Sequence, residues 1–124
     1  MNPTDIRYSK EHTWLKVDGD TGTIGITEFA QSELGEVVYV DLPQVGKRFK
    51  KDEVFGSVEA VKTTSDLFMP VSGEVIETNP ALKDNASLVN SASFTDGWMI
   101  RIKLADPSEV DGLLDVQAYE AMVH

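Results

Sequence analysis

The strongest structural constraint in this sequence is a pair of β-like runs separated by a short polar segment. Residues 54–61 are rich in β-branched and aromatic side chains and alternate loosely, and an apolar run resumes at residues 67–71. Two such runs around a polar segment predict a strand, a turn and a second strand. The small polar residues 63–66 can close a tight turn through side-chain to backbone hydrogen bonds. The pattern therefore places Lys62 at or next to the tip of a hairpin.

The residues before this hairpin predict a first hairpin, a short helix and a strand. Two β-like runs within residues 8–26 are separated by a turn rich in Asp and Gly at residues 18–22. Thr27 as a cap, an acidic first turn and a Gly at the far end predict a helix over residues 28–34. We expect Phe29 and Leu34 to be its core contacts. The β-branched residues 36–42 predict a strand that ends at a proline.

The residues after the hairpin predict one more clear strand and a helical C-terminus. Residues 97–104 alternate between apolar and polar side chains, so one face should be core and the other should face water. The predicted core face comprises Trp98, Ile100, Ile102 and Leu104, and the predicted solvent face comprises Arg101 and Lys103. Residues 107–110 and 115–123 predict helical pieces, the second capped by Asp115. Its apolar stripe consists of Leu114, Val116, Tyr119 and Val123.

A short internal repeat flanks the lysine hairpin. The sequence Gly-Glu-Val-Val at residues 35–38 returns as Gly-Glu-Val-Ile at residues 73–76, and Lys-Asp at residues 51–52 returns at residues 83–84. Two copies are too few for a solenoid. The repeat instead indicates two similar four-stranded halves around a pseudo-twofold axis, joined by the hairpin that carries Lys62.

Length, charge and cysteine content exclude several classes of protein. A chain of 124 residues predicts a single domain, residues 1–124, with a core large enough to be stable without disulfides or a structural metal. It has no cysteine, and its net charge of −10 argues against nucleic-acid binding. No apolar stretch is long enough to span a membrane, and the first residues resemble no signal peptide. We therefore expect a monomer in a bacterial cytoplasm that binds neither nucleic acid nor membrane.

The residues around Lys62 resemble the lipoyl-attachment hairpin of the glycine cleavage system H protein family. The resemblance rests on Glu59, Ala60, Val61 and Lys62, followed by Ser-Asp at residues 65–66 and by Pro-Val-Ser-Gly-Glu-Val at residues 70–75. The family usually has Ser where this chain has Ala60. Biotin carriers flank their lysine with methionine on both sides, whereas Val61 and Thr63 flank Lys62 here. The flanks therefore favour lipoate over biotin.

The resemblance extends over nearly the whole chain, from about residue 8 to the final helix. It includes residues 8–12, 23–27, 34–40, 88–91 and 97–100. It implies a mainly β fold, a barrel-sandwich hybrid of two antiparallel sheets with pseudo-twofold halves. A short helix in the N-terminal region and C-terminal helices at about residues 107–124 complete it, and the lysine hairpin spans about residues 54–76. The N-terminal hairpin and the C-terminal helices distinguish this family from smaller lipoyl and biotinyl domains.

The resemblance also implies a carrier that is not itself an enzyme. Lys62 would hold lipoate through an amide, and Glu59, Ala60 and Val61 would help a lipoate ligase or octanoyltransferase to recognise the hairpin. The arm would accept the aminomethyl group of glycine at glycine decarboxylase (P protein) and deliver it to aminomethyltransferase (T protein). Dihydrolipoyl dehydrogenase (L protein) would then reoxidise the arm.

The residues themselves show no constellation typical of a catalyst or a metal site. His12 and His124 lie at opposite ends of the sequence, without a clear nucleophile or a metal-ligand spacing nearby. We expect His12, beside Trp14, to be structural or partly exposed. The family often has Glu at the position of Thr13, where a carboxylate would hold the amine of a loaded arm. Because Thr13 has no carboxylate, the sequence does not identify the residues that would line a site for the loaded arm.

Two alternative functions use the same features. One is a relay in which the protein donates lipoate to the 2-oxoacid dehydrogenases, and both roles can coexist. The other is a binding or scaffold protein that keeps the fold and has lost the chemistry. The intact Lys62 argues against the scaffold.

Overall fold

The computed structural model describes residues 6–123 and shows a mainly β protein with several short helices. The strands are β1 (Arg7–Tyr8), β2 (Thr13–Asp18), β3 (Thr21–Ile26), β4 (Val37–Asp41), β5 (Arg48–Phe49), β6 (Val54–Ala60), β7 (Thr64–Phe68), β8 (Gly73–Thr78) and β9 (Ile100–Leu104). The helices are α1 (Glu28–Leu34), α2 (Ala81–Asp84), α3 (Leu88–Ser91) and α4 (Val116–Val123), with a 3-10 helix at Pro107–Gly112. None of the helices within residues 6–123 is long and apolar enough to cross a membrane.

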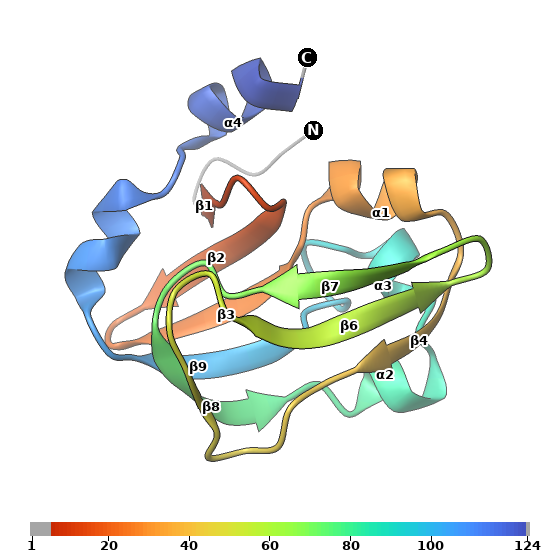
Figure 1. The fold of residues 1–124 in the computed structure, drawn as a ribbon, viewed down its shortest axis with the longest axis horizontal. Coiled ribbons are helices and arrows are strands. Elements are labelled where there is room, and N and C mark those ends of the chain that lie inside the picture. The colour runs from red at the N-terminus through yellow and green to blue at the C-terminus, as the bar shows by residue number, and fades with distance from the viewer. Residues whose placement is uncertain (1–5, 124) are drawn as a thin grey trace.

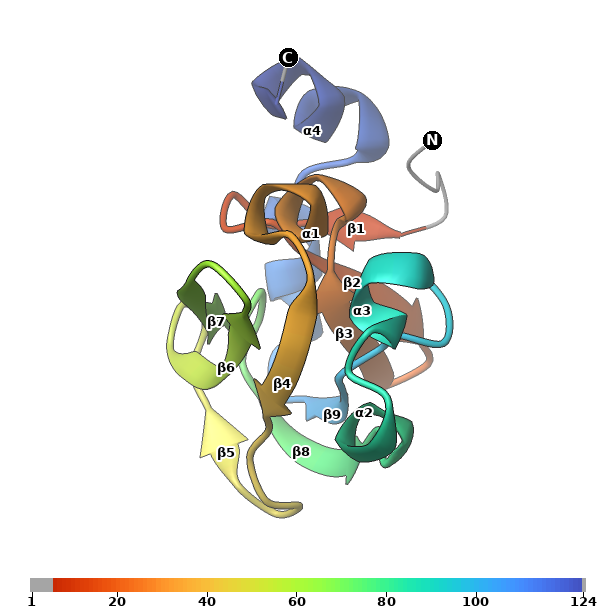
Figure 2. The same cartoon turned by 90° about the vertical axis from the view of Figure 1, so that its right-hand side faces the viewer.

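Two antiparallel sheets form the body, as predicted. One contains six strands in the order β1-β2-β3-β9-β8-β5, and the other contains three in the order β4-β6-β7. In Figure 1 the hairpin of β6 and β7 lies above β4, and its turn extends beyond the rest of the fold. Figure 2 looks onto that end and shows α1 above β4, the β6–β7 hairpin to the left of β4, and α2 and α3 to its right. The small sheet thus presents one hairpin outward.

The two Gly-Glu-Val segments of the internal repeat adopt the same local structure. Val37 and Val75 are both buried, and a break in strand register follows each of them, in β4 and in β8. The residue at each break, Val38 in one copy and Ile76 in the other, is exposed. The Lys-Asp repeat has no such equivalence, because Asp52 lies in a turn at φ 73° and Asp84 ends α2. The structure therefore confirms a local likeness between β4 and β8, whereas the two four-stranded halves stay a prediction.

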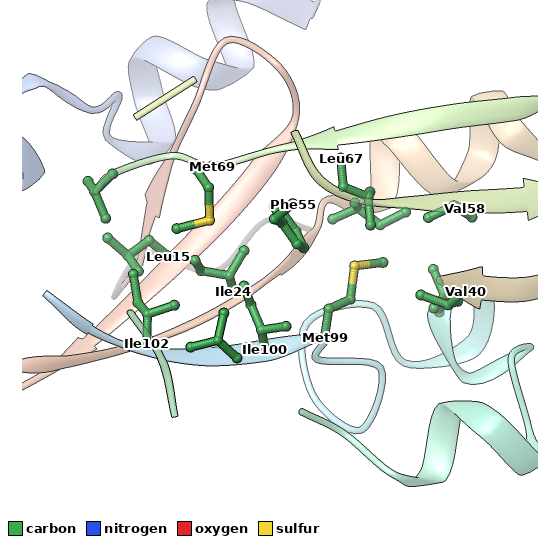
Figure 3. Packing of buried hydrophobic residues seen from close by; sticks show 14 of the residues in the cluster. Leu15, Ile24, Val40, Phe55, Val58, Leu67, Met69, Met99, Ile100 and Ile102 are labelled. Atoms are coloured by element: carbon green, nitrogen blue, oxygen red, sulfur yellow. The ribbon is translucent and has the colours of Figure 1, made fainter. Parts of the chain in front are cut away.

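The main core lies between the two sheets. Phe55, Val58 and Leu67 from the small sheet face apolar residues of the large sheet, among them Ile24 and Ile100 (Figure 3). The predicted alternation of the last strand is confirmed at three core positions, Ile100, Ile102 and Leu104, and at two exposed ones, Arg101 and Lys103. Trp98 was also predicted to share this core face, and that prediction is wrong. The strand begins only at Ile100, and half-buried Trp98 packs against a second cluster.

The second cluster joins the two ends of the described chain. It is formed by Ile6, Tyr8, Trp14 and Tyr119, and the predicted stripe residues Leu114, Val116 and Val123 pack against it. The rings of Tyr8 and Tyr119 stack with their centroids 4.7 Å apart. Asp115 accepts a hydrogen bond from the Ala118 amide at 2.8 Å, which confirms the predicted cap of α4.

Helix α1 has the predicted ends, but only one of its two predicted core contacts. The Thr27 hydroxyl accepts a hydrogen bond from the Ala30 amide at the start, and Gly35 ends the helix at φ 81°. Leu34 packs against the main core. Phe29 does not, because its half-buried ring lies 4.8 Å from the ring of His12 instead.

Candidate functional site

Lys62 lies in the turn between β6 and β7, as predicted. The two strands pair as far as Glu59 and Thr64, and the Ala60 amide donates a hydrogen bond to the Thr63 carbonyl at 2.7 Å. The turn therefore consists of Val61, Lys62 and Thr63. All three residues are exposed.

The predicted turn was too long on its C-terminal side. Thr64, Ser65 and Asp66 were assigned to the turn because they are small and polar, but all three belong to β7. They pair in register with Glu59, Val58 and Ser57 of β6. Backbone hydrogen bonds to the neighbouring strand hold them extended, so their polarity does not mark a turn.

The aliphatic stem of Lys62 lies close to Gly35. A Cβ atom placed on Gly35 would lie 3.3 Å from Cε of Lys62, and Gly35 also has a φ of 81°, which side chains rarely adopt. The sequence identified Gly35 only as a helix end, so this contact was not predicted. Among the described residues, the Lys62 ammonium makes no ion pair. Its nitrogen is therefore available for acylation.

The three residues before Lys62 occupy different environments. Glu59 and Val61 are exposed, whereas Ala60 is buried. The Val61 amide donates to the carbonyl of Glu36, the residue just before β4, at 2.9 Å. A protein that binds the hairpin can touch Glu59 and Val61 directly. Ala60 can influence such binding only through the shape of the strand.

A pocket of about 350 Å³ lies between α1, β2 and β7. Three carboxylates line it, from Glu11, Glu33 and Asp66, and its described lining contains no lysine or arginine. Thr13 also lines the pocket, but it is buried, and its hydroxyl lies 2.6 Å from that of Ser9. The negative charge of this pocket therefore comes from residues other than Thr13, and the sequence did not identify them.

His12 forms part of the pocket wall and has the structural role that was expected. Its Nδ1 lies 2.9 Å from the Tyr119 hydroxyl, which in turn lies 2.6 Å from the Thr27 hydroxyl. Partial burial lowers the pKa of His12, although the nearby carboxylates Glu11 and Glu33 oppose this effect. His12 thus connects the start of β2 to α1 and α4, and its burial favours the neutral ring. The other histidine, His124, lies outside the described residues.

A mainly β body that presents a single lysine at the tip of a projecting hairpin has the arrangement of a carrier protein. Within residues 6–123, no group of three histidines or carboxylates could hold a metal ion.

Comparison with known proteins identifies the particular family. The family model described as Glycine cleavage H-protein matches residues 6–124. The glycine cleavage system H proteins of Symbiobacterium thermophilum and Brevibacillus brevis are 50% and 52% identical to this chain. The first alignment covers 96% of this chain and 93% of the relative, and the second covers 98% and 96%. The chain therefore belongs to the glycine cleavage H-protein family.

A solved structure agrees with this membership. The crystal structure of a glycine cleavage system H protein from Mycobacterium marinum superposes with a TM-score of 0.91 at 32% identity. The match covers 98% of each chain. The likeness in fold confirms the predicted fold class. Membership in this family confirms that the protein is a carrier component of the glycine cleavage system and not a catalyst.

Proposed function

We propose that Lys62 carries lipoate and that the loaded protein moves the aminomethyl group of glycine between enzymes of the glycine cleavage system. The observation that supports this most strongly is the placement of Lys62 in a three-residue turn, exposed and without an ion pair among the described residues. The far part of its side chain, Cδ, Cε and Nζ, passes beside Gly35, which has no side chain to obstruct it.

Attachment would require only presentation from this chain. The neutral Nζ of Lys62 attacks the carbonyl carbon of an activated lipoyl donor on the attaching enzyme, a lipoate ligase or octanoyltransferase. A C–N bond forms, the bond from the carbonyl to the leaving group breaks, and Nζ loses a proton. An octanoyl group attached in this way would then need sulfur insertion by another enzyme. Glu59 and Val61 would contribute by contacting the attaching enzyme beside Lys62.

When attached, lipoate supplies a disulfide that accepts the aminomethyl group at the glycine decarboxylase. The protein would then present that arm to the aminomethyltransferase, and after that to the dihydrolipoyl dehydrogenase. The rigid hairpin keeps the tether at one fixed point, so the carried group reaches each enzyme at a high effective concentration. This division of labour fits a chain whose own residues form no catalytic arrangement that the sequence could identify.

We further propose that the acidic pocket beside α1 is where the loaded arm rests. An aminomethyl group carries an amine that is positively charged at neutral pH, and Glu11, Glu33 and Asp66 give this pocket a negative charge. These carboxylates would replace the one that the family often has at the position of Thr13. The pocket is bordered by α1 and β7, the two elements next to Lys62.

The same lipoylated lysine would serve a relay of lipoate to the 2-oxoacid dehydrogenases. Transfer of the lipoyl group from the purified loaded protein to an unmodified dehydrogenase lipoyl domain would test this second role. We also propose a monomer in the bacterial cytoplasm, in line with the bacterial origin of its relatives. Light scattering would measure the oligomeric state.

The deciding experiment is the intact mass of the protein co-expressed with a lipoate ligase and lipoate, followed by mapping of the modified fragment. We expect one lipoyl increment, on Lys62. Lys62→Arg keeps the positive charge but cannot form the same amide, so it should fold normally, remain unmodified and fail to support glycine cleavage by the other three proteins. Modification at another lysine, a biotin increment, or glycine cleavage supported by Lys62→Arg would each contradict the assignment.

A further inference from the structure

Two consecutive apolar side chains of β4 are exposed close to the lysine turn. Val38 is 52% exposed and Tyr39 is 55% exposed, although both belong to a strand whose neighbouring residues Val37 and Val40 are buried. A regular strand would send only one of two neighbouring side chains outward. The break in pairing between Val37 and Tyr39 adds one residue to β4, and so both side chains reach the outer surface.

The equivalent position in the other half of the protein shows that this exposure of two apolar residues is particular to the lysine side. There the break in β8 exposes Ile76, which is 41% exposed, but the next residue is Glu77. Glu77 forms an ion pair with Arg101 at 3.3 Å. The two halves thus share the bulge and differ in the residue after it. Only the half next to Lys62 has an aromatic residue, Tyr39, in that place.

The exposed pair is continuous with the lysine turn. Tyr39 pairs directly with Glu59, and the Val61 amide donates to the carbonyl of Glu36, two residues before Val38. Val61 is 70% exposed and adds a third apolar side chain beside Lys62. We call the three residues Val38, Tyr39 and Val61 the apolar strip. At its far end, Tyr39 also lines a groove of about 600 Å³ with Val45 and Leu82.

Carboxylates border the apolar strip. Glu36, Asp41 and Glu59 are all exposed, and within residues 6–123 none of them forms an ion pair. An apolar centre with an aromatic residue and a charged border is the usual composition of a protein-binding surface. The sign of the border favours a partner with lysine or arginine residues around an apolar patch.

We propose that the apolar strip is the surface on which the lipoate-attaching enzyme docks, with its acidic border facing basic residues of that enzyme. This inference rests on the proposed lipoylation of Lys62 and adds the side from which the enzyme approaches. An attaching enzyme must bring its acyl donor to Nζ of Lys62 itself, so its surface has to contact residues directly around the turn. Enzymes that act on the far end of the arm have no such requirement.

The apolar strip and the acidic pocket adjoin opposite edge strands of the small sheet. The apolar strip follows β4, whereas the pocket is formed by α1, β2 and β7. Asp41 beside the strip and Asp66 of the pocket lie in one row across the sheet, with Ser57 of β6 between them. Figure 2 looks onto the end of the protein that carries the turn and shows β4 beside the β6–β7 hairpin. An enzyme that covers the apolar strip would approach Lys62 from the β4 edge of this sheet.

The test compares lipoylation rates of single variants with a bacterial lipoate–protein ligase, lipoate and ATP. We expect Tyr39→Ser to lower kcat/KM about tenfold, and Val38→Ser several-fold, mainly through KM, since neither side chain touches the reacting atoms. Ile76→Ser is the matched control, because it removes the equivalent exposed residue at the equivalent bulge of the other half. It should leave kcat/KM unchanged.

A second measurement uses the unchanged protein. Amide resonances of Val38, Tyr39 and Val61 should shift when the ligase is added without an acyl donor, and those of β8 should not. If circular dichroism shows that a variant has lost its fold, these resonance shifts of the unchanged protein still test the docking surface. Lipoylation of the parent on Lys62 with equal rates for all variants, or shifts confined to the pocket side, would overturn the docking surface and leave the function intact. A parent that is never lipoylated would overturn both.

Discussion

Tyr119 shows how a single side chain connects distant parts of this protein. Its hydroxyl lies within hydrogen-bond distance of both Thr27 and His12, and its ring stacks on Tyr8. We expect Tyr119→Phe to keep the stack and to lose about 1–2 kcal/mol of unfolding free energy, because the buried Thr27 hydroxyl loses a partner. Urea unfolding would measure this loss. Tyr39→Phe, at an exposed ring, is the control, and equal midpoints for the two variants would contradict the prediction.

His12 gives the protein a pH-dependent contribution to stability. Burial is the main cause of its lowered pKa, so the folded state prefers the neutral ring more than the unfolded state does. The stabilisation is complete above about pH 6.5, the ordinary pKa of histidine, and is lost as the pH falls below it and through the folded pKa.

The variant His12→Asn should remove this dependence. Asparagine tolerates the positive φ of 66° at this position and does not titrate. Between about pH 8 and pH 5, the parent should lose more unfolding free energy than the variant. Parallel pH profiles in urea unfolding would show that His12 does not contribute.

At the level of elements, the lysine hairpin depends on a close approach between β6 and β4. A Cβ atom on Gly56 would collide with the backbone carbonyl oxygen of Asp41. Because backbone cannot move aside cheaply, Gly56→Ala should cost about 3 kcal/mol or more and displace β4 from the hairpin. Gly19→Ala is the control, since that position is open and adds only the strain of its φ of 65°. Similar thermal midpoints for the two variants would count against this packing argument.

The sequence predicted most elements because their signals are local. The caps of α1 and α4 and the alternation at Ile100, Ile102 and Leu104 depend only on neighbouring residues. The end of the lysine turn was misjudged because polar residues suit both a turn and the exposed face of a strand. Pairing of Thr64 with Glu59, on the opposite strand, decided between them.

At the level of the whole molecule, α4 stabilises the second cluster and is remote from Lys62. Deleting residues 115–124 would expose the ring of Tyr8 and remove a fully buried Tyr119. We expect a loss of at least about 3 kcal/mol in unfolding free energy, because two aromatic rings lose their burial at roughly 1.5–3 kcal/mol each. Lipoylation on Lys62 should persist at temperatures where the truncated protein stays folded, because the hairpin packs in the main core. Intact mass measures lipoylation, and urea unfolding measures the loss of unfolding free energy. A truncated protein that stays folded but is not lipoylated would show that Lys62 does depend on α4.

The sequence by itself determined that the protein is mainly β and that Lys62 lies at a hairpin tip, because alternation and turn residues are set by neighbours along the chain. The resemblance to the H protein family was also visible in the sequence. Only the tertiary structure decided what surrounds Lys62. Gly35, the acidic pocket and the apolar strip come from segments that are separate in sequence and that meet through strand pairing and helix packing. The exposure of both Val38 and Tyr39 depends on a bulge, which is defined by register with a neighbouring strand and has no counterpart in the alternation of residues along the chain.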